Sequence, residues 1–216
     1  MTIDAPGYLA AARTARDLIA DPAVSTAWDR PSALPGFTVG GLAAHLGSQV
    51  LMVADLLAAD PPVAESVRAL DHYARATWVG ADRDAAINVA IRDRGEQLAG
   101  DGHAALLAAV DEALAGLESA LPAADPARPM PTPAGPWALP LAETLLTRTL
   151  EISVHLDDLA VSVDLPTPPL PEDTLLPVLG LLATLAARRH GQPAVLRALT
   201  RSERASGSIV AFGPQD

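Results

Sequence analysis

The sequence of 216 residues contains no cysteine and no lysine. Without cysteine, the chain forms no disulfide and has no cysteine nucleophile, so a thiol that takes part in its chemistry has to come from a ligand. All 15 basic residues are arginine, against 26 acidic residues, and the formal net charge is −11. Nucleic acid is therefore not an expected partner, because its recognition requires a positively charged surface.

Aromatic residues make up only 3% of the chain, while half of all residues are hydrophobic and most of these are alanine or leucine. This composition favours α-helices over a β-sandwich. No apolar run reaches membrane-spanning length without a charge or a proline, which predicts a soluble protein with no membrane partner. The first residues show no basic stretch followed by an apolar one, so we expect no signal peptide and a cytoplasmic location.

The spacing of the apolar residues predicts helices that are separated by proline-rich segments. Thr38 is a suitable N-cap for the second of these helices, and Pro61 and Pro62 end it. The expected helices cover residues 4–20, 38–59, 82–121 with a break at 100–102 as an alternative, 141–163, and 172–200 with a break at 191–193 as an alternative. Residues 63–80 are expected to be partly helical, and residues 208–212 to form a short strand or an extended segment.

Four amphipathic helices, joined in two places by long connections, predict an all-α protein built as a helical bundle with crossovers. A proline-rich segment over residues 165–171 divides the chain. We expect the bundle within residues 1–165, and a short C-terminal helix and tail within residues 166–216 that packs on the bundle. The sequence shows no internal repeat.

Two side chains that can bind a metal, Glu151 and His155, stand four residues apart within the apolar stripe of the helix expected over 141–163. A carboxylate on a buried face needs a partner, because burial of an unpaired charge is costly. A divalent metal satisfies both side chains, and an ordinary Glu–His pair at the edge of the core is the alternative.

His45 is the leading candidate for a third ligand, since it flanks the apolar stripe of a helix that is expected to face Glu151 and His155. Two histidines and one carboxylate are the ligand set of open catalytic zinc sites. Nickel and iron also accept this set, so the identity of the metal stays open. A lone histidine beside an apolar stripe is also common as a core residue with ordinary hydrogen bonds. His72 and His103 lie in weakly patterned segments and are expected to be solvated.

Two blocks of the sequence resemble the mycothiol-dependent maleylpyruvate isomerase N-terminal domain family, which belongs to the DinB-like superfamily of four-helix bundles. The first block is Trp28-x2-Pro31-Ser32, then Leu34-Pro-Gly-Phe-Thr-Val39, then Leu42-Ala-Ala-His45-Leu46. The second block is Pro140-Leu-Ala-Glu143, then Thr147-Arg148, Glu151, Val154-His155 and Asp157-Asp-Leu159. The resemblance covers about residues 5–165.

This resemblance implies a DinB-like four-helix bundle that holds zinc, or another divalent metal, through His45, Glu151 and His155. It also implies that mycothiol binds near the metal as a thiolate. Asp158 is then expected to orient the metal ligands or to contact the thiol cofactor, with an ordinary surface acid as the alternative. Arg148 is expected on the same side of the helix, where it binds an anionic substrate or neutralises Glu151.

Trp137, just before the helix over 141–163, is the tryptophan that we expect in the wall of a cofactor pocket. The isomerase itself has a large C-terminal α/β domain with a catalytic arginine, whereas only about fifty residues follow Pro166 here. That arginine has no matching position, and proximity alone offers five candidates: Arg188, Arg189, Arg197, Arg201 and Arg204.

The expected function is therefore that of a metal-dependent thiol-using transferase or isomerase that acts on a small electrophilic substrate, with transfer of the thiol favoured over maleylpyruvate isomerisation. The alternative is a helical bundle that binds a metal or a ligand without turnover, as a sensor or a partner module. A monomer and a homodimer are both compatible with the sequence.

Overall fold

The computed structural model describes residues 2–205 and 207–212, and within them the chain is mostly helical. The helices are α1 (Ala5–Ile19), α2 (Pro22–Thr26), α3 (Val39–Ala58), α4 (Ala69–Arg75), α5 (Ala86–Ala99), α6 (His103–Ala120), α7 (Leu141–Ser162), α8 (Glu172–His190) and α9 (Gln192–Thr200). The strands are β1 (Glu65–Ser66), β2 (Pro129–Pro131) and β3 (Trp137–Pro140), and short 3-10 turns lie at Leu121–Ala123 and Ser202–Arg204.

The helices lie close to the positions that the sequence predicts. The break at residues 100–102 is present, and Gly102 there has φ +87°, a conformation that favours glycine. The helix that was expected from residue 82 begins only at Ala86. Helix α2 and the three strands were not predicted, because segments of two to five residues are too short to show a periodicity.

Side-chain caps set where the two N-terminal long helices begin. The Asp4 carboxylate accepts a hydrogen bond from the backbone N–H of Gly7 at 2.9 Å, and the Thr38 hydroxyl accepts one from Gly41 at the same distance. Each cap satisfies a backbone donor that has no partner within its helix. The Thr38 cap was predicted, and it fixes the start of α3, the helix that carries His45.

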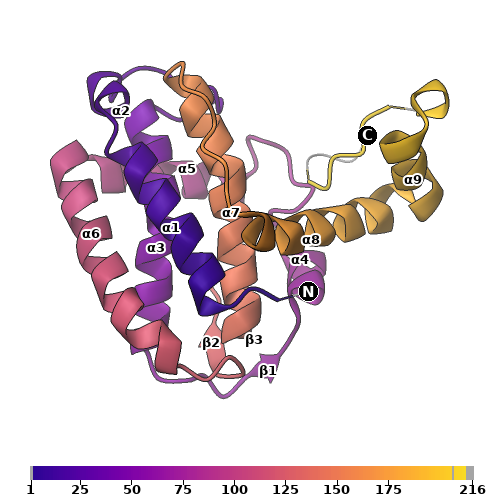
Figure 1. Cartoon of the computed structure of the whole chain (residues 1–216), viewed down its shortest axis with the longest axis horizontal. Helices are drawn as coiled ribbons and strands as arrows, with labels where there is room; N and C mark the ends of the chain where they lie inside the picture. Colours follow the sequence, from indigo (N-terminus) through magenta and orange to yellow (C-terminus); the bar gives the residue numbers. More distant parts are fainter. Residues whose placement is uncertain (1, 206, 213–216) are drawn as a thin grey trace.

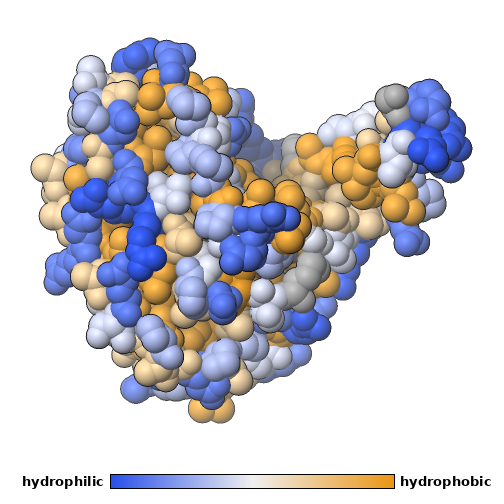
Figure 2. All heavy atoms as spheres, in the orientation of Figure 1, coloured by the Kyte–Doolittle hydropathy of each residue, from blue (hydrophilic) through white to orange (hydrophobic). Residues whose placement is uncertain are grey.

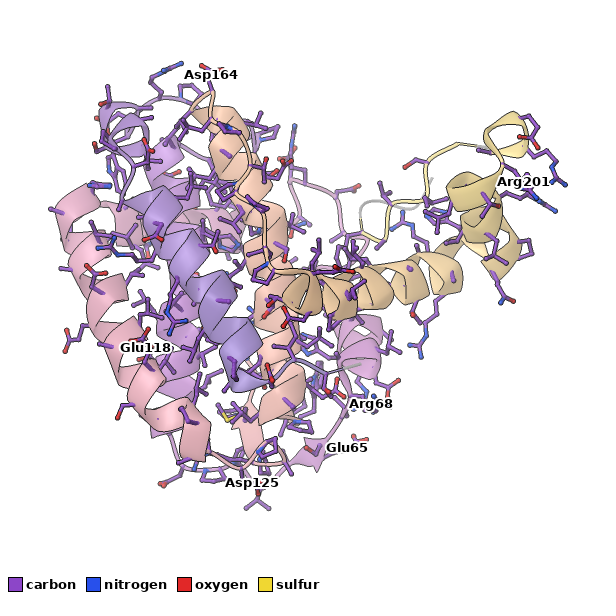
Figure 3. All side chains as sticks on the ribbon, in the orientation of Figure 1. Glu65, Arg68, Glu118, Asp125, Asp164 and Arg201 are labelled. Atoms are coloured by element: carbon purple, nitrogen blue, oxygen red, sulfur yellow. The ribbon has the colours of Figure 1, made fainter. Side chains whose placement is uncertain are left out.

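Helices α1, α3, α6 and α7 lie side by side along most of their length (Figure 1), with α3 in contact with α5, α6 and α7. Their facing sides form one hydrophobic core. Its largest fully buried side chains include Tyr8, Ile19, Leu42, Leu46, Leu117, Leu146, Leu150, Ile152, Leu156 and Leu159. Ion pairs at the surface add little to this core: Glu118, on the side of α6 next to α1 (Figure 3), pairs with Arg13 of α1 at 2.7 Å, and both side chains are exposed.

A small three-stranded sheet, in the order β1-β3-β2, closes one end of the helices. β3 pairs in parallel with β1 and antiparallel with β2, and it runs directly into α7. Next to this sheet, the carboxylate of Glu143 in the first turn of α7 accepts hydrogen bonds from the backbone N–H of Ala69 at 2.9 Å and from Arg68 Nε at 3.1 Å. These bonds attach the start of α4 to α7.

Helix α3 is long and apolar enough to cross a membrane by the criteria of length and composition alone. Half of its residues are buried inside the protein, and it is surrounded by α5, α6 and α7. The same length and composition are common for the central helix of a folded core, so this finding is weak evidence for a membrane span.

Beyond residue 165 the chain forms an arm that leaves the other helices (Figure 1). α8 contacts α1 and α7 at one end, and α9 follows α8. Apolar side chains are exposed along this arm (Figure 2), among them Leu176, Leu179, Leu196 and Leu199. Residues 208–212 form no strand, and the ring of Phe212 lies 5.3 Å from the rings of both Tyr73 and Trp78.

Candidate metal centre

Glu151 and His155 lie one turn apart on α7, with 3.5 Å between Glu151 Oε2 and His155 Nε2. Their spacing of four residues places both side chains on one face of the helix. Both are partly buried, in a helix whose neighbouring residues belong to the core. The pair that the sequence singles out is therefore formed in the structure.

His45 on α3 lies opposite this pair. The centroids of the His45 and His155 rings are 4.6 Å apart, and the two rings are nearly perpendicular. One ligand atom from each of His45, Glu151 and His155 can be chosen so that all three lie within 4.8 Å of one another. The three metal ligands that the resemblance implies are brought together from two helices.

Asp158 fixes the orientation of the His155 ring. His155 Nδ1 donates a hydrogen bond to Asp158 Oδ2 at 2.9 Å, so Nε2 is the atom directed at Glu151. Burial alone lowers the pKa of His155, but the hydrogen bonds with Asp158 and Glu151 outweigh burial and raise this pKa to about 9. A carboxylate that binds the second ring nitrogen of a histidine is the usual support of a metal ligand.

The charge of Glu151 is maintained in spite of its burial. Burial alone raises the pKa of this carboxyl, but the hydrogen bond with His155 and the charge of Arg148 outweigh it and lower the pKa to about 2. Glu151 is therefore ionised at neutral pH and supplies an anionic oxygen, as a carboxylate that binds a metal must.

Burial, together with the nearby charge of His155, lowers the pKa of His45 to about 4. The His45 ring is consequently neutral at pH 7 and offers a lone pair. Within the described part of the chain, no hydrogen bond reaches either ring nitrogen of His45. Two imidazoles and one carboxylate that converge in this way fit a divalent cation, and the residues leave further coordination positions open.

The three side chains form part of the wall of a cavity of about 440 Å³. Much of the remaining wall is apolar and includes Leu34, Phe37, Met52, Trp78, Ile91 and Leu98. Four arginines also line it: Arg83, Arg92, Arg94 and Arg148. The volume suits a small molecule of the size that protein pockets commonly bind.

Arg148 is positioned by Gln49 of α3. Its Nη1 donates a hydrogen bond to Gln49 Oε1 at 2.8 Å and lies 3.8 Å from Met52 Sδ. Gln49 is only 2% exposed, and its amide also donates to the backbone oxygen of His45 at 3.0 Å. Among the described residues Arg148 makes no direct ion pair with Glu151, although its charge helps to lower the pKa of that carboxyl.

Trp137 and Asp158 lie behind the cavity wall rather than in it. Trp137 Nε1 donates a hydrogen bond to His72 Nδ1 at 3.2 Å, and His72 is the residue that lines the cavity. The tryptophan that forms part of the wall is Trp78. Trp137 and Asp158 thus each reach the site through a histidine, His72 and His155 respectively.

The expectation that His72 is solvated is wrong, since only 3% of this residue is exposed. Burial and the charge of Arg148 lower the pKa of His72 to about 4, so this ring is neutral. His103 is not freely solvated either, because it is partly buried and its Nε2 lies 2.7 Å from the backbone oxygen of Ile19.

None of the five C-terminal arginines lines the cavity. Arg188 Nη1 instead donates to the backbone oxygen of Leu70 at 3.0 Å. Arg201 lies at the far end of the arm (Figure 3). The structure therefore offers no replacement for the isomerase arginine among these residues.

Comparison with known proteins adds a finding to this geometry. The sequence model of the family named mycothiol maleylpyruvate isomerase N-terminal domain matches residues 8–160. The chain belongs to this family. No curated protein and no solved structure matches the chain. The part that matches the mycothiol maleylpyruvate isomerase N-terminal domain contains His45, Glu151, His155, Arg148 and Asp158, and it ends before α8.

The cavity of this isomerase-like domain is also lined by residues that the sequence did not single out: Gln49, His72, Arg92 and Arg94. Gln49 follows His45 by four positions within an apolar stripe, which is the same signal that singled out Glu151 and His155. His72 gave no comparable signal, because α4 has only seven residues. The closely spaced Arg92 and Arg94 were visible in the sequence, but nothing local indicates that both line the cavity.

Proposed function

We propose that this chain is a metal-dependent, thiol-using transferase or isomerase that acts on a small electrophilic substrate. His45, Glu151 and His155 hold the metal, which is zinc, and mycothiol is the thiol. The proposal includes a DinB-like four-helix bundle made by α1, α3, α6 and α7. The observation that carries it is the convergence of the three potential ligands at the wall of a cavity that also has room for organic ligands.

The metal supplies one piece of chemistry: it lowers the pKa of a bound thiol, so that a thiolate is available at neutral pH. The chain itself contains no thiol, so the nucleophile has to enter the cavity as a ligand. Asp158 keeps Nε2 of His155 directed at the site, and Gln49 keeps Arg148 at its edge.

Mycothiol is favoured as the thiol by the family to which the chain belongs. Transfer is favoured over isomerisation of maleylpyruvate, because no C-terminal arginine of this chain lines the cavity. Asp158 and Trp137, which the sequence suggested as contacts of the thiol, act in this proposal through His155 and His72 instead.

Metal analysis and a conjugation assay test the proposal. The purified protein is expected to bind about one equivalent of zinc, and His45→Ala, Glu151→Ala and His155→Ala are each expected to deplete it. His103→Ala, on α6 and outside the cavity wall, is the matched control and should keep the metal. Full zinc retention in all three ligand variants would refute the site.

The conjugation assay follows the zinc-dependent reaction of mycothiol with a small alkylating electrophile. Conjugation that exceeds the uncatalysed rate and is lost with the zinc supports an enzyme. Binding of zinc and mycothiol without any such acceleration would instead identify a non-catalytic binding bundle.

A further inference from the structure

The hydrogen bond between Trp137 and His72 determines which nitrogen of His72 carries its proton. An indole N–H is a donor only, so His72 Nδ1 has to be the acceptor at 3.2 Å. A neutral imidazole with an unprotonated Nδ1 carries its hydrogen on Nε2. Trp137 therefore holds His72 in the tautomer that has an Nε2–H donor.

This donor has no acceptor in the described part of the protein. His72 is 97% buried, since only 3% of it is exposed, and its ring lines the cavity while Trp137 stands behind it. His72 Nε2 is not among the sealed side-chain atoms that lack a partner, so it is open to the cavity, where a ligand or a water can accept its hydrogen bond. The Nε2–H is thus the polar group that His72 presents at the cavity wall.

Thr144 lies on the same wall. Its hydroxyl has no hydrogen-bond partner in the described part of the chain, but it is sealed and not itself open to a ligand in the cavity. Thr144, Arg148, Glu151 and His155 recur at spacings of four, three and four, so they share one face of α7. With a rise of ~1.5 Å per residue, the Arg148 backbone lies roughly 5 to 10 Å along the helix from the backbones of Glu151 and His155.

The charge of the wall is opposite to that of the whole protein. The chain has a net charge of −11, yet four arginines line the cavity, and Glu151, a proposed metal ligand, is its one acidic residue among the described ones. Arg148 is also close enough to His72 to lower the pKa of that ring. A cation next to an unpartnered N–H is a recognition site for an anionic oxygen.

We propose that the His72 Nε2–H and the Arg148 guanidinium form a subsite for the carboxylate of the electrophilic substrate, with Trp137 as the positioning residue that fixes the tautomer of His72. The subsite lies one to two turns of α7 from the metal ligands. The preferred substrates are consequently small electrophiles whose carboxylate lies a few bonds from the reacting carbon. The role of this subsite in substrate binding rests on the proposed function, whereas the binding of a carboxylate there does not.

Carboxylate binding is tested by nitrogen NMR of the histidine rings in the zinc-loaded protein, titrated with acetate or with its neutral isostere acetamide. The His72 signal, assigned from its loss in His72→Gln, is expected to show an unprotonated Nδ1 and a protonated Nε2. Acetate should shift the Nε2 signal and acetamide should not. Arg148→Gln should weaken the acetate response about tenfold or more, while Arg30→Gln, an exposed arginine outside the cavity, should leave it unchanged.

Trp137→Phe tests the positioning role without touching the cavity wall. We expect His72 to lose its single tautomer in this variant and the acetate response to weaken. A protonated Nδ1 in the parent protein, or equal responses to acetate and acetamide, would overturn the subsite. Acetate binding that survives both Arg148→Gln and Trp137→Phe would place the anion elsewhere, for example on the zinc, and would also overturn it.

The link to the reaction is tested with iodoacetate and iodoacetamide as electrophiles for mycothiol. In both reactions the thiolate sulfur forms a bond to the CH₂ carbon and iodide leaves with the electrons of the broken C–I bond. Relative to the uncatalysed rates, iodoacetate is expected to be the better substrate. Arg148→Gln should raise the KM for iodoacetate about tenfold or more relative to the KM for iodoacetamide, so that the preference for the carboxylate is lost.

The two proposals fail in different ways. If neither electrophile reacts faster than without protein, the proposed function fails, and the NMR titration still decides the subsite. If both react faster but with no preference for iodoacetate, the enzyme stands and the carboxylate subsite is refuted.

Discussion

Replacing Glu143 by alanine tests how the protein holds α4, and therefore His72, against the cavity. Glu143 is only 6% exposed, and its carboxylate accepts from the buried backbone N–H of Ala69 at 2.9 Å and from Arg68 Nε at 3.1 Å. Glu143→Ala leaves that N–H without a partner. Glu143→Gln keeps an acceptor oxygen at the same position and loses only the charge.

The expected magnitude follows from these contacts. A hydrogen bond to a charged group contributes about 1.5–3 kcal/mol, and the bond to Ala69 is of this kind. The ion pair with Arg68 adds at most about 1 kcal/mol, because the Arg68 side chain is 68% exposed and screened by solvent. A carboxylate in the first turn of α7 adds about 0.3–1 kcal/mol through the helix dipole. We expect Glu143→Ala to lower the free energy of unfolding by about 2–4 kcal/mol and Glu143→Gln by about 1–2 kcal/mol.

Urea unfolding measures these differences, and amide hydrogen exchange locates them. In Glu143→Ala the amides of α4 should exchange faster while those of α6 keep their protection relative to global unfolding. Glu118→Ala, which removes an exposed ion pair on α6, is the matched control and should change stability by less than about 1 kcal/mol. Equal losses in Glu143→Ala and Glu143→Gln would refute the reasoning, because the acceptor oxygen would then have no role.

Three further predictions concern the metal centre and the start of α3. Asp158→Asn should weaken zinc binding about 10- to 100-fold in a metal-competition titration, since it removes the carboxylate that orients His155; an unchanged affinity would contradict this role. Because the metal-free protein holds a proton on His155 up to a pKa of about 9, zinc has to displace that proton. Zinc affinity should consequently rise about tenfold per pH unit between pH 6 and 8. Calorimetry in buffers of different ionisation enthalpy should show that one proton is released for each zinc bound. If no proton is released at pH 7, the His155 ring is not protonated in the metal-free protein. Gly41→Ala should lower the free energy of unfolding by about 1–3 kcal/mol in urea, because a Cβ at this position would collide with the Glu96 carboxylate, which accepts hydrogen bonds from Thr38. Unchanged stability would show that the Glu96 side chain can move aside.

The positions of the long helices were predictable because their signals are local. The Thr38 cap and the apolar stripe around Leu42 and Leu46 indicate α3 without knowledge of any other segment. The pairing of Glu151 with His155 follows in the same way from the pitch of one helix. By contrast, α4 is short and gains its burial from β3 and α7, so no pattern within it indicated that His72 is buried.

The role of Trp137 illustrates the same limit at the level of a single side chain. Its place before α7 suggested a position in the wall of a cofactor pocket, but Trp137 is not among the residues that line the cavity. The sequence does not show, however, that β3 directs the indole N–H to His72 rather than to the cavity. The arginines of the cavity wall were equally hidden, because nothing near Arg92 and Arg94 in the sequence indicates that α5 packs against α3.

The sequence by itself determined the helical class, the absence of an internal thiol, and the pair Glu151 and His155, because composition and helix periodicity act over a few neighbouring residues. Only the tertiary structure decided that His45, more than a hundred residues earlier in the chain, meets this pair across the core, and that His72 lies in the cavity wall. Contacts between α3, α4 and α7 depend on how whole helices pack, and no local pattern encodes the side of a helix that a distant segment will cover.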